Sequence, residues 1–155
     1  MLAVLLVIAV GCTSGGGRAG GPLDASFSKL DGSQSSFASY HGTPVVVNFF
    51  SSTCVPCVTE MPALQALHQQ IGTKVAFLGM DVQDTVPSAT AFVATVKVTW
   101  DIGRDPDGSI LQKEFGGIGL PTTVVLDREG NVVKQWLAPV PIDELTRLLH
   151  DKGFS

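Results

Sequence analysis

The sequence has few charged residues and no excess of basic ones. Lysine and arginine number 10 against 14 aspartate and glutamate residues, which gives a formal net charge of −4. Proteins that bind nucleic acids carry a basic patch or stripe, so this balance argues against a nucleic-acid partner. Charged residues make up 15% of the chain and apolar ones 45%, which suits one hydrophobic core in a chain of 155 residues.

Cysteine is also scarce, with three in the whole chain. Three are too few for the disulfide frameworks of small secreted domains. Cys54 and Cys57 are separated by two residues, whereas Cys12 stands alone near the N-terminus. No further cysteine or histidine pair is spaced to complete a zinc site with them, so we expect no metal and no cofactor.

No apolar run is long enough to cross a bilayer, which takes about 20 residues. Residues 1–10 (MLAVLLVIAV) are wholly apolar and match the core of a signal peptide instead. Gly11 and Cys12 follow directly, so that residues 9–12 are similar to the lipobox of bacterial lipoproteins. The similarity implies cleavage before Cys12 and attachment of lipid to that residue. The alternative is a core strand with a spare cysteine.

Two features depart from the lipobox pattern. Ala9 replaces the commoner leucine, and no lysine or arginine precedes the apolar run, so we expect the natural start to lie upstream of Met1. Residues 13–21 (TSGGGRAGG) have the composition of a flexible tether. The expected order is therefore a signal peptide over 1–11, a lipid-anchored tether over 12–22 and a folded domain over 23–155, on the outer face of a bacterial cell membrane.

Hydrophobic periodicity predicts alternating strands and helices in the folded part. Two short strands joined by a turn should form an N-terminal hairpin, and another turn signal joins the last two strands. Pro62 predicts a kink or irregularity in the first long helix. The expected strands are 25–30, 34–37, 45–50, 74–80, 98–102, 122–126 and 132–137, the expected helices are 55–70, 87–96, 109–115 and 141–152, and the segments 81–86 and 104–108 are expected as a loop and a turn.

The cysteine pair lies where a buried strand passes into a helix. Residues 45–57 read VVVNFFSSTCVPC, a β-branched run, a short polar loop and then the two cysteines. At a helix N-terminus, unpaired N–H groups and the helix dipole favour a thiolate. This spacing at such a junction predicts thiol–disulfide chemistry. A static disulfide or half of a zinc site is the alternative.

Two segments carry a resemblance to a known family. PVVVNFFSSTCVPCVTEMPAL (44–64) and IGLPTTVVLDREGNV (118–132) resemble the thioredoxin superfamily, and within it the membrane-anchored TlpA/ResA-like thiol–disulfide oxidoreductases. The resemblance covers about residues 23–152. It implies an α/β fold with a mixed β-sheet flanked by helices, an N-terminal hairpin and a central helix–strand insertion at about 87–102.

The resemblance and helix chemistry together assign roles to three residues. Cys54 is expected to be the attacking thiolate and Cys57 the more buried resolving thiol. Glu60, one helical turn beyond Cys57, is the expected proton handler, because a carboxyl beside the core has a raised pKa. Classical thioredoxins use a buried aspartate where this chain has Asn48. The alternative for Glu60 is a solvated residue favoured by the helix dipole.

Four further residues are expected to contact the substrate. Pro121 resembles the family's cis-proline, which would present Leu120 to an extended substrate segment; the alternative is a trans proline at a strand start. Thr53 precedes the first cysteine, where the family has an aromatic residue, and Pro56 lies between the cysteines. The loss of the aromatic removes a flat apolar wall near the disulfide, which is expected to alter substrate preference and reduction potential.

The resemblance implies protein thiols or disulfides as substrates. One hypothesis is a reductant of apocytochrome c that draws electrons from a membrane thiol carrier, and another is an oxidant that forms disulfides in exported proteins. A thiol peroxidase is less favoured, because its signature needs a proline before the reactive cysteine at a distance where this chain has none. A copper chaperone would need three residues between its cysteines.

The histidines and tryptophans are expected outside the site. His41, His68 and His150 are predicted to be surface residues, with His68 on the polar side of its helix. Trp100 and Trp136 are predicted to fill the core or an interface.

Overall fold

The computed structural model describes residues 24–155, so the predicted signal peptide, tether and lipid site at Cys12 lie outside the described residues. Strands and helices alternate along this part of the chain as the periodicity predicts. The strands are β1 (Ser26–Ser28), β2 (Gln34–Ser36), β3 (Val45–Phe50), β4 (Ala76–Val82), β5 (Asp101–Asp105), β6 (Thr122–Leu126) and β7 (Val132–Trp136), and the helices are the 3₁₀ helix η2 (Phe37–Tyr40), α1 (Val55–Ile71), α2 (Val86–Val96), α3 (Ser109–Phe115) and α4 (Ile142–Asp151).

Five strands form one mixed sheet in the order β5-β4-β3-β6-β7. β3, β4 and β5 run parallel, whereas β6 and β7 are antiparallel to their neighbours. Phe50 at the end of β3 lies opposite Asp81, and Thr122 at the start of β6 lies opposite Phe49. The segments after β3 and β4 and the segment before β6 therefore meet at one edge of the sheet, which we call the cysteine edge.

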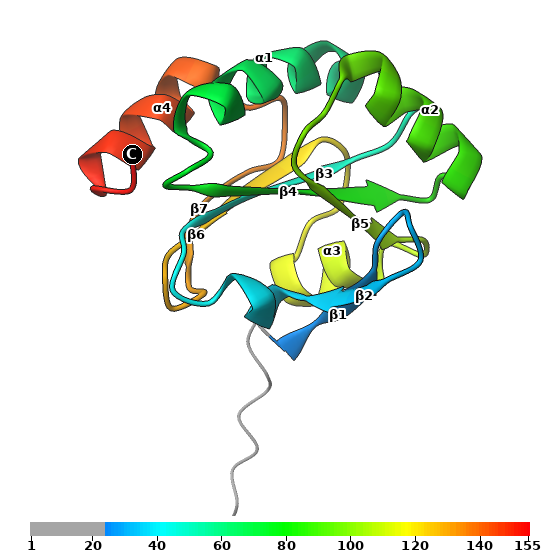
Figure 1. Cartoon of the computed structure of the whole chain (residues 1–155), viewed down its shortest axis with the longest axis horizontal. Helices are drawn as coiled ribbons and strands as arrows, with labels where there is room; N and C mark the ends of the chain where they lie inside the picture. Colours follow the sequence, from blue (N-terminus) through cyan, green and yellow to red (C-terminus); the bar gives the residue numbers. More distant parts are fainter. Residues whose placement is uncertain (1–23) are drawn as a thin grey trace, which may run out of the picture.

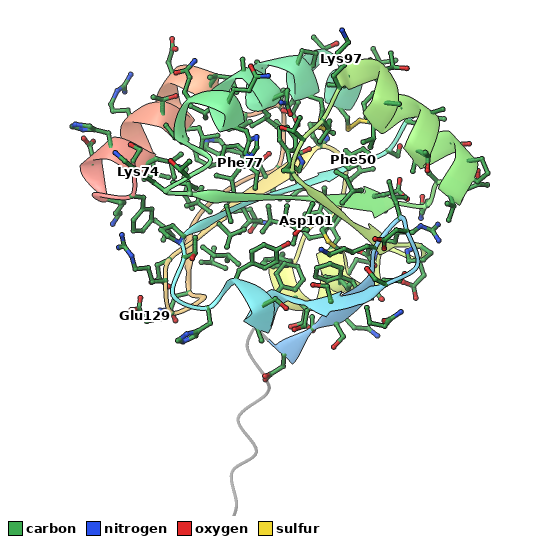
Figure 2. The ribbon with its side chains drawn as sticks, in the orientation of Figure 1. Phe50, Lys74, Phe77, Lys97, Asp101 and Glu129 are labelled. Atoms are coloured by element: carbon green, nitrogen blue, oxygen red, sulfur yellow. A yellow bond between two sulfur atoms is a disulfide. The ribbon has the colours of Figure 1, made fainter. Side chains whose placement is uncertain are left out.

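Helices and hairpin cover opposite faces of this sheet. α1, α2 and α4 lie on one face, and α3 with the β1–β2 hairpin lies on the other (Figure 1). Alternate residues of β3 face the two layers: Val46 and Phe50 join the core under the three helices, while Val47 and Phe49 join the core over α3. Figure 2 shows Phe50 and Phe77 between the sheet and the helices. The predicted mixed α/β sheet with its N-terminal hairpin is confirmed.

Some predicted boundaries were wrong. β4 extends through Asp81 to Val82, where a loop was expected, because both residues are buried in the sheet. β5 lies at 101–105 and not at 98–102, because residues 101–105 pair with Leu78 to Val82. α1 runs without interruption through Pro62.

His68 differs from its prediction as well. It is half-buried, with its ring edge-on to Phe77 and Trp100 at centroid distances of 5.2 and 5.4 Å. Burial lowers the pKa of His68. Trp100 is in the core, as predicted, and Trp136 packs against this core cluster. None of the helices found between residues 24 and 155 combines the length and the apolar character that crossing a bilayer would need.

Candidate active site

The two cysteines of the pair form a disulfide at the start of α1. Their sulfurs are 2.04 Å apart and their Cα atoms 5.2 Å apart. Cys54 is the N-cap residue of the helix, and its sulfur accepts a hydrogen bond of 3.3 Å from the backbone N–H of Cys57. Cys57 is fully buried, whereas Cys54 is partly exposed. A thiolate on Cys54 would take the place of a carboxylate or hydroxyl cap, where N–H groups and the helix dipole stabilise negative charge.

Glu60 is buried one turn further along the same helix, at 7% exposure. Asn48 Nδ2 donates to Glu60 Oε1 at 2.8 Å, and the backbone N–H of Val140 donates to Oε2 at 2.9 Å. Burial raises the pKa of Glu60, against the two hydrogen bonds, which lower it. The raised pKa was predicted, and a solvated Glu60 is excluded. The carboxyl is therefore placed to gain or lose a proton close to the buried cysteine.

Asn48 makes side-chain hydrogen bonds that were not predicted from the sequence. Its side chain lies 2% exposed on β3 and bridges Glu60 to Thr123, whose Oγ1 accepts at 3.0 Å from Asn48 Nδ2. The amide thus fixes the carboxyl of Glu60 against the sheet. The signal was present, because Asn48 is the polar residue within the otherwise apolar strand 45–50.

The segment before β6 reaches the same edge of the sheet. The Leu120–Pro121 peptide bond is cis, as predicted. Thr122 Oγ1 donates to the carbonyl of Gly119 at 2.8 Å, and Ile118 is 91% exposed. Val55 beside Cys54 is 75% exposed. The cysteine edge therefore carries exposed apolar side chains from two segments, while Thr53 and Pro56 are exposed on the first of them.

A group of charged residues that sequence reasoning missed lies behind the loop before Cys54. Asp84 accepts from the backbone N–H of Ser52 at 2.5 Å and from its hydroxyl at 2.9 Å. Arg104 Nη2 donates to the carbonyl of Asp84 at 2.8 Å. Asp81 is fully buried beside both. The signal was Asp81 and Asp84, two aspartates close together at the end of an apolar run.

Potential metal ligands are not clustered in the part of the chain that the structure describes. Within residues 24–155, no three histidine, cysteine, aspartate or glutamate side chains are grouped so that they could hold an ion.

Comparison with known proteins identifies the family. The AhpC/TSA family profile matches residues 22–135, which is more than half of the chain. The chain belongs to the AhpC/TSA family. Within this thioredoxin-like family, it is 29% identical over 107 residues to the thiol-disulfide oxidoreductase ResA of Bacillus thuringiensis, covering 68% of this chain and 61% of ResA. The predicted thioredoxin-like, ResA-like membership is confirmed.

Other relatives agree with this placement. The thioredoxin-like protein YneN of Bacillus subtilis is 31% identical over 110 residues, covering 69% of this chain and 64% of YneN. A solved DsbF homologue from Corynebacterium diphtheriae superposes with a TM-score of 0.77 at 26% identity, covering 89% of this chain and 96% of that one. The chain spans 61% and 64% of the lengths of ResA and YneN.

Proposed function

We propose that this protein is an exported thiol–disulfide oxidoreductase that reduces disulfides in other proteins, with the haem-attachment cysteines of apocytochrome c as its substrate. The observation that carries the proposal is the unequal cysteine pair. Cys54 is partly exposed at the N-cap of α1, and Cys57 is buried behind it. A partly exposed thiolate with a buried resolving thiol is the arrangement that thiol–disulfide exchange needs. The name of ResA, a thiol-disulfide oxidoreductase, supports the same chemistry.

The exchange would proceed in two balanced steps. The Cys54 thiolate attacks one sulfur of a substrate disulfide, which forms a mixed disulfide and releases one substrate thiolate. Cys57, after losing its proton, attacks Cys54 Sγ and releases the second substrate thiolate. The two substrate thiolates take up protons, so that the substrate gains two electrons and two protons. The enzyme is left with the Cys54–Cys57 disulfide, which a membrane thiol carrier would reduce again.

Glu60 is proposed as the acceptor of the Cys57 proton. Glu60 is three positions after Cys57 along α1, so their side chains share one face of the helix. Both carboxylate oxygens already hold N–H donors, which fixes the carboxyl while leaving each oxygen a further lone pair. Glu60→Gln should slow resolution of the mixed disulfide by about 10²-fold near neutral pH. An unchanged pH–rate profile in stopped-flow measurements would remove Glu60 from this role.

The cysteine edge is proposed as the surface that receives the substrate. Val55 and Ile118 supply exposed apolar area at this edge. The other residues expected to contact the substrate are the exposed Thr53 and Pro56, the partly exposed Leu120 and the buried Pro121. An extended segment could lie here with its backbone along the segment before β6. Thr53→Trp should alter KM for a disulfide peptide and leave the thiolate reactivity of Cys54 toward iodoacetamide unchanged.

Measuring the reduction potential of the Cys54–Cys57 pair tests the direction of the exchange. The full chain is equilibrated with thiol buffers, and alkylated thiols are counted by mass spectrometry. A potential near about −270 mV supports a reductant, and one near about −120 mV supports an oxidant of exported proteins. Reduction of an oxidised haem-attachment peptide is then assayed, with Cys54→Ser as the inactive control and peroxide consumption as the test for a peroxidase.

Attachment to the membrane through Cys12 has a separate test. The 155-residue chain is expressed in a bacterium, and the membrane and soluble fractions are compared with those of Cys12→Ala. Lipid on Cys12 predicts that the wild-type chain is found with membranes and is labelled by a fatty-acid analogue, and that the variant loses the label. Equal labelling of both would contradict the anchor.

A further inference from the structure

Three side chains from parallel strands stand in one row at the cysteine edge. Asp81 on β4 is opposite Phe50 of β3 on one side and opposite Arg104 of β5 on the other. Neighbours in register point to the same face of a sheet, and Phe50 faces α1 and α2. Asp81 and Arg104 therefore lie under the helices, at the strand ends from which the loop 51–53 continues to Cys54.

Asp84 ties this row to the loop. Its carboxylate receives both the backbone N–H and the hydroxyl of Ser52, two residues before Cys54. Arg104 holds Asp84 from the other side through the Asp84 carbonyl. A charged acceptor with two donors on one residue is a strong contact, and it fixes the backbone at the entrance to α1.

The Asp81 carboxyl lies next to this contact and makes no side-chain hydrogen bond with the described residues. Its side chain is 0% exposed, and neither carboxylate oxygen has a hydrogen-bond partner among the described residues. Arg104 Nε lies 3.5 Å from Asp81 Oδ2, close enough for charge attraction but without a hydrogen bond. Burial, followed by the neighbouring Asp84, raises the pKa of Asp81 to about 7, against Arg104, which lowers it.

The other elements around Asp81 add little charge. β3 has no ionisable residue, and neither does α2. On α1 the only charged candidates are Glu60, which is bonded to Asn48 and Val140, and His68, which packs against Trp100 near the other end of the helix. Once the disulfide is reduced, the Cys54 and Cys57 thiols are the remaining groups at this edge that can change charge.

We propose that Asp84 and Asp81 are positioning residues for the Cys54–Cys57 pair: Asp84 holds the loop before Cys54 through Ser52, and Asp81 binds a proton whose release is linked to the redox state of the pair. The proposal rests on the proposed exchange at Cys54 but not on its direction. Reduction places a thiolate charge at the edge, and a second negative charge on Asp81 becomes less favourable there. The reduced protein therefore retains the Asp81 proton to higher pH than the oxidised protein does.

The dependence of reduction potential on pH measures this link. The full chain is equilibrated with thiol buffers between about pH 5 and about pH 9, where extra proton uptake on reduction appears as a steeper fall of potential with pH. The reduction potentials of wild type and Asp81→Asn should be equal near pH 6. Near pH 8, reduction of Asp81→Asn should be favoured over wild type by about threefold to tenfold, the effect of one nearby charge at an effective dielectric constant of about 20.

Two further variants separate this effect from a structural one. Asp84→Asn removes a group that raises the pKa of Asp81, so the steep region should move to lower pH. Glu129→Gln removes the same charge from an exposed turn, which Figure 2 shows at the other end of the sheet from Phe50, and should keep the wild-type curve. If the reduction potential of Asp81→Asn changed with pH in parallel with that of wild type over the whole pH range, the proposal would be overturned.

Wild-type protein alone gives a second test if Asp81→Asn does not fold. The ¹³C shift of the Asp81 carboxyl is followed against pH in the oxidised and reduced forms. Because linkage is reciprocal, a redox-linked proton requires a higher midpoint in the reduced form. Equal midpoints would refute the link. Either result stands whether or not apocytochrome c is reduced, so failure of the proposed substrate is distinguishable from failure of this proposal.

Discussion

Glu60 and Asp81 are two buried acids on the helix-covered face of the sheet, and they are held in opposite ways. Glu60 has an N–H donor on each oxygen and, within residues 24–155, no salt bridge to a cation. Asp81 has a cation 3.5 Å away and no hydrogen bond among residues 24–155. Burial raises the pKa of both, but hydrogen bonds oppose the rise at Glu60, whereas a second carboxyl adds to it at Asp81. Burial therefore raises the pKa of both acids, but only the Glu60 carboxyl is also fixed in place by hydrogen bonds in the described residues.

The surrounding elements explain the contrast. Glu60 faces β3 and the segment just before α4, and each offers an N–H donor: Asn48 Nδ2, which also donates to Thr123, and the backbone N–H of Val140. Asp81 belongs to a central strand whose backbone groups are engaged by β3 and β5. The groups that approach the Asp81 carboxyl are therefore side chains. They are the carboxyl of Asp84 and the guanidinium of Arg104, which donates its hydrogen bond to the Asp84 carbonyl. Two predictions follow from this difference in how the two carboxyls are held.

Removing the two carboxyls should have unequal costs. Glu60→Ala leaves Asn48 Nδ2 with one acceptor fewer and the N–H of Val140 buried without one, and it should lower the free energy of unfolding by about 3 kcal/mol. Asp81→Ala should change it by within about 1 kcal/mol, because the raised pKa of Asp81 means that the folded protein is not stabilised by its ionised carboxylate. Urea unfolding of the oxidised proteins at pH 7 measures both. Equal losses would show that burial, and not bonding, decides the cost.

The dependence of stability on pH should come mainly from Asp81. Its folded pKa of about 7 is above the ordinary aspartate value of 3.8, so the folded state binds more protons between these values and loses stability as pH rises. From about pH 5 to about pH 8, the free energy of unfolding should fall by about 2 kcal/mol. Asp81→Asn should flatten this fall, and Glu129→Gln should leave it. A steep fall that persists in Asp81→Asn would assign it to another group.

The sequence was sufficient for the disulfide pair and for the raised pKa of Glu60, because both depend on local order. Cys54, Cys57 and Glu60 lie within one strand–loop–helix segment, where spacing along the helix decides which side chains meet. The cis bond at Leu120–Pro121 was reached through family resemblance. The α/β layering was predictable for a similar reason, since apolar periodicity distinguishes strands from helices.

The contacts of Asn48, Asp81 and Asp84 depended on strand order and register, which periodicity does not give. Asp81 was placed in a loop, because an aspartate after an apolar run is typical of a strand end. It lies in β4 because pairing with β3 and β5 continues beyond Met80. His68 was wrongly assigned to the surface for the same reason, since Phe77 and Trp100 reach it from β4 and from the segment before β5.

The smallest expected effect tests whether Asp84 acts on the loop separately from Asp81. Ser52→Ala removes the hydroxyl that donates to Asp84 Oδ1 and keeps the backbone N–H that donates to Oδ2, so it should lower the free energy of unfolding by about 1 kcal/mol. In an Asp84→Ala background the same change should cost almost nothing, because its acceptor is already gone. Ser51→Ala is the matched control, since the Ser51 hydroxyl contacts only that of Thr53 in the bonds observed. If the cost of Ser52→Ala is the same in both backgrounds, the hydroxyl is held by something other than Asp84. Asp84 would then hold the loop before Cys54 through the backbone N–H of Ser52 alone.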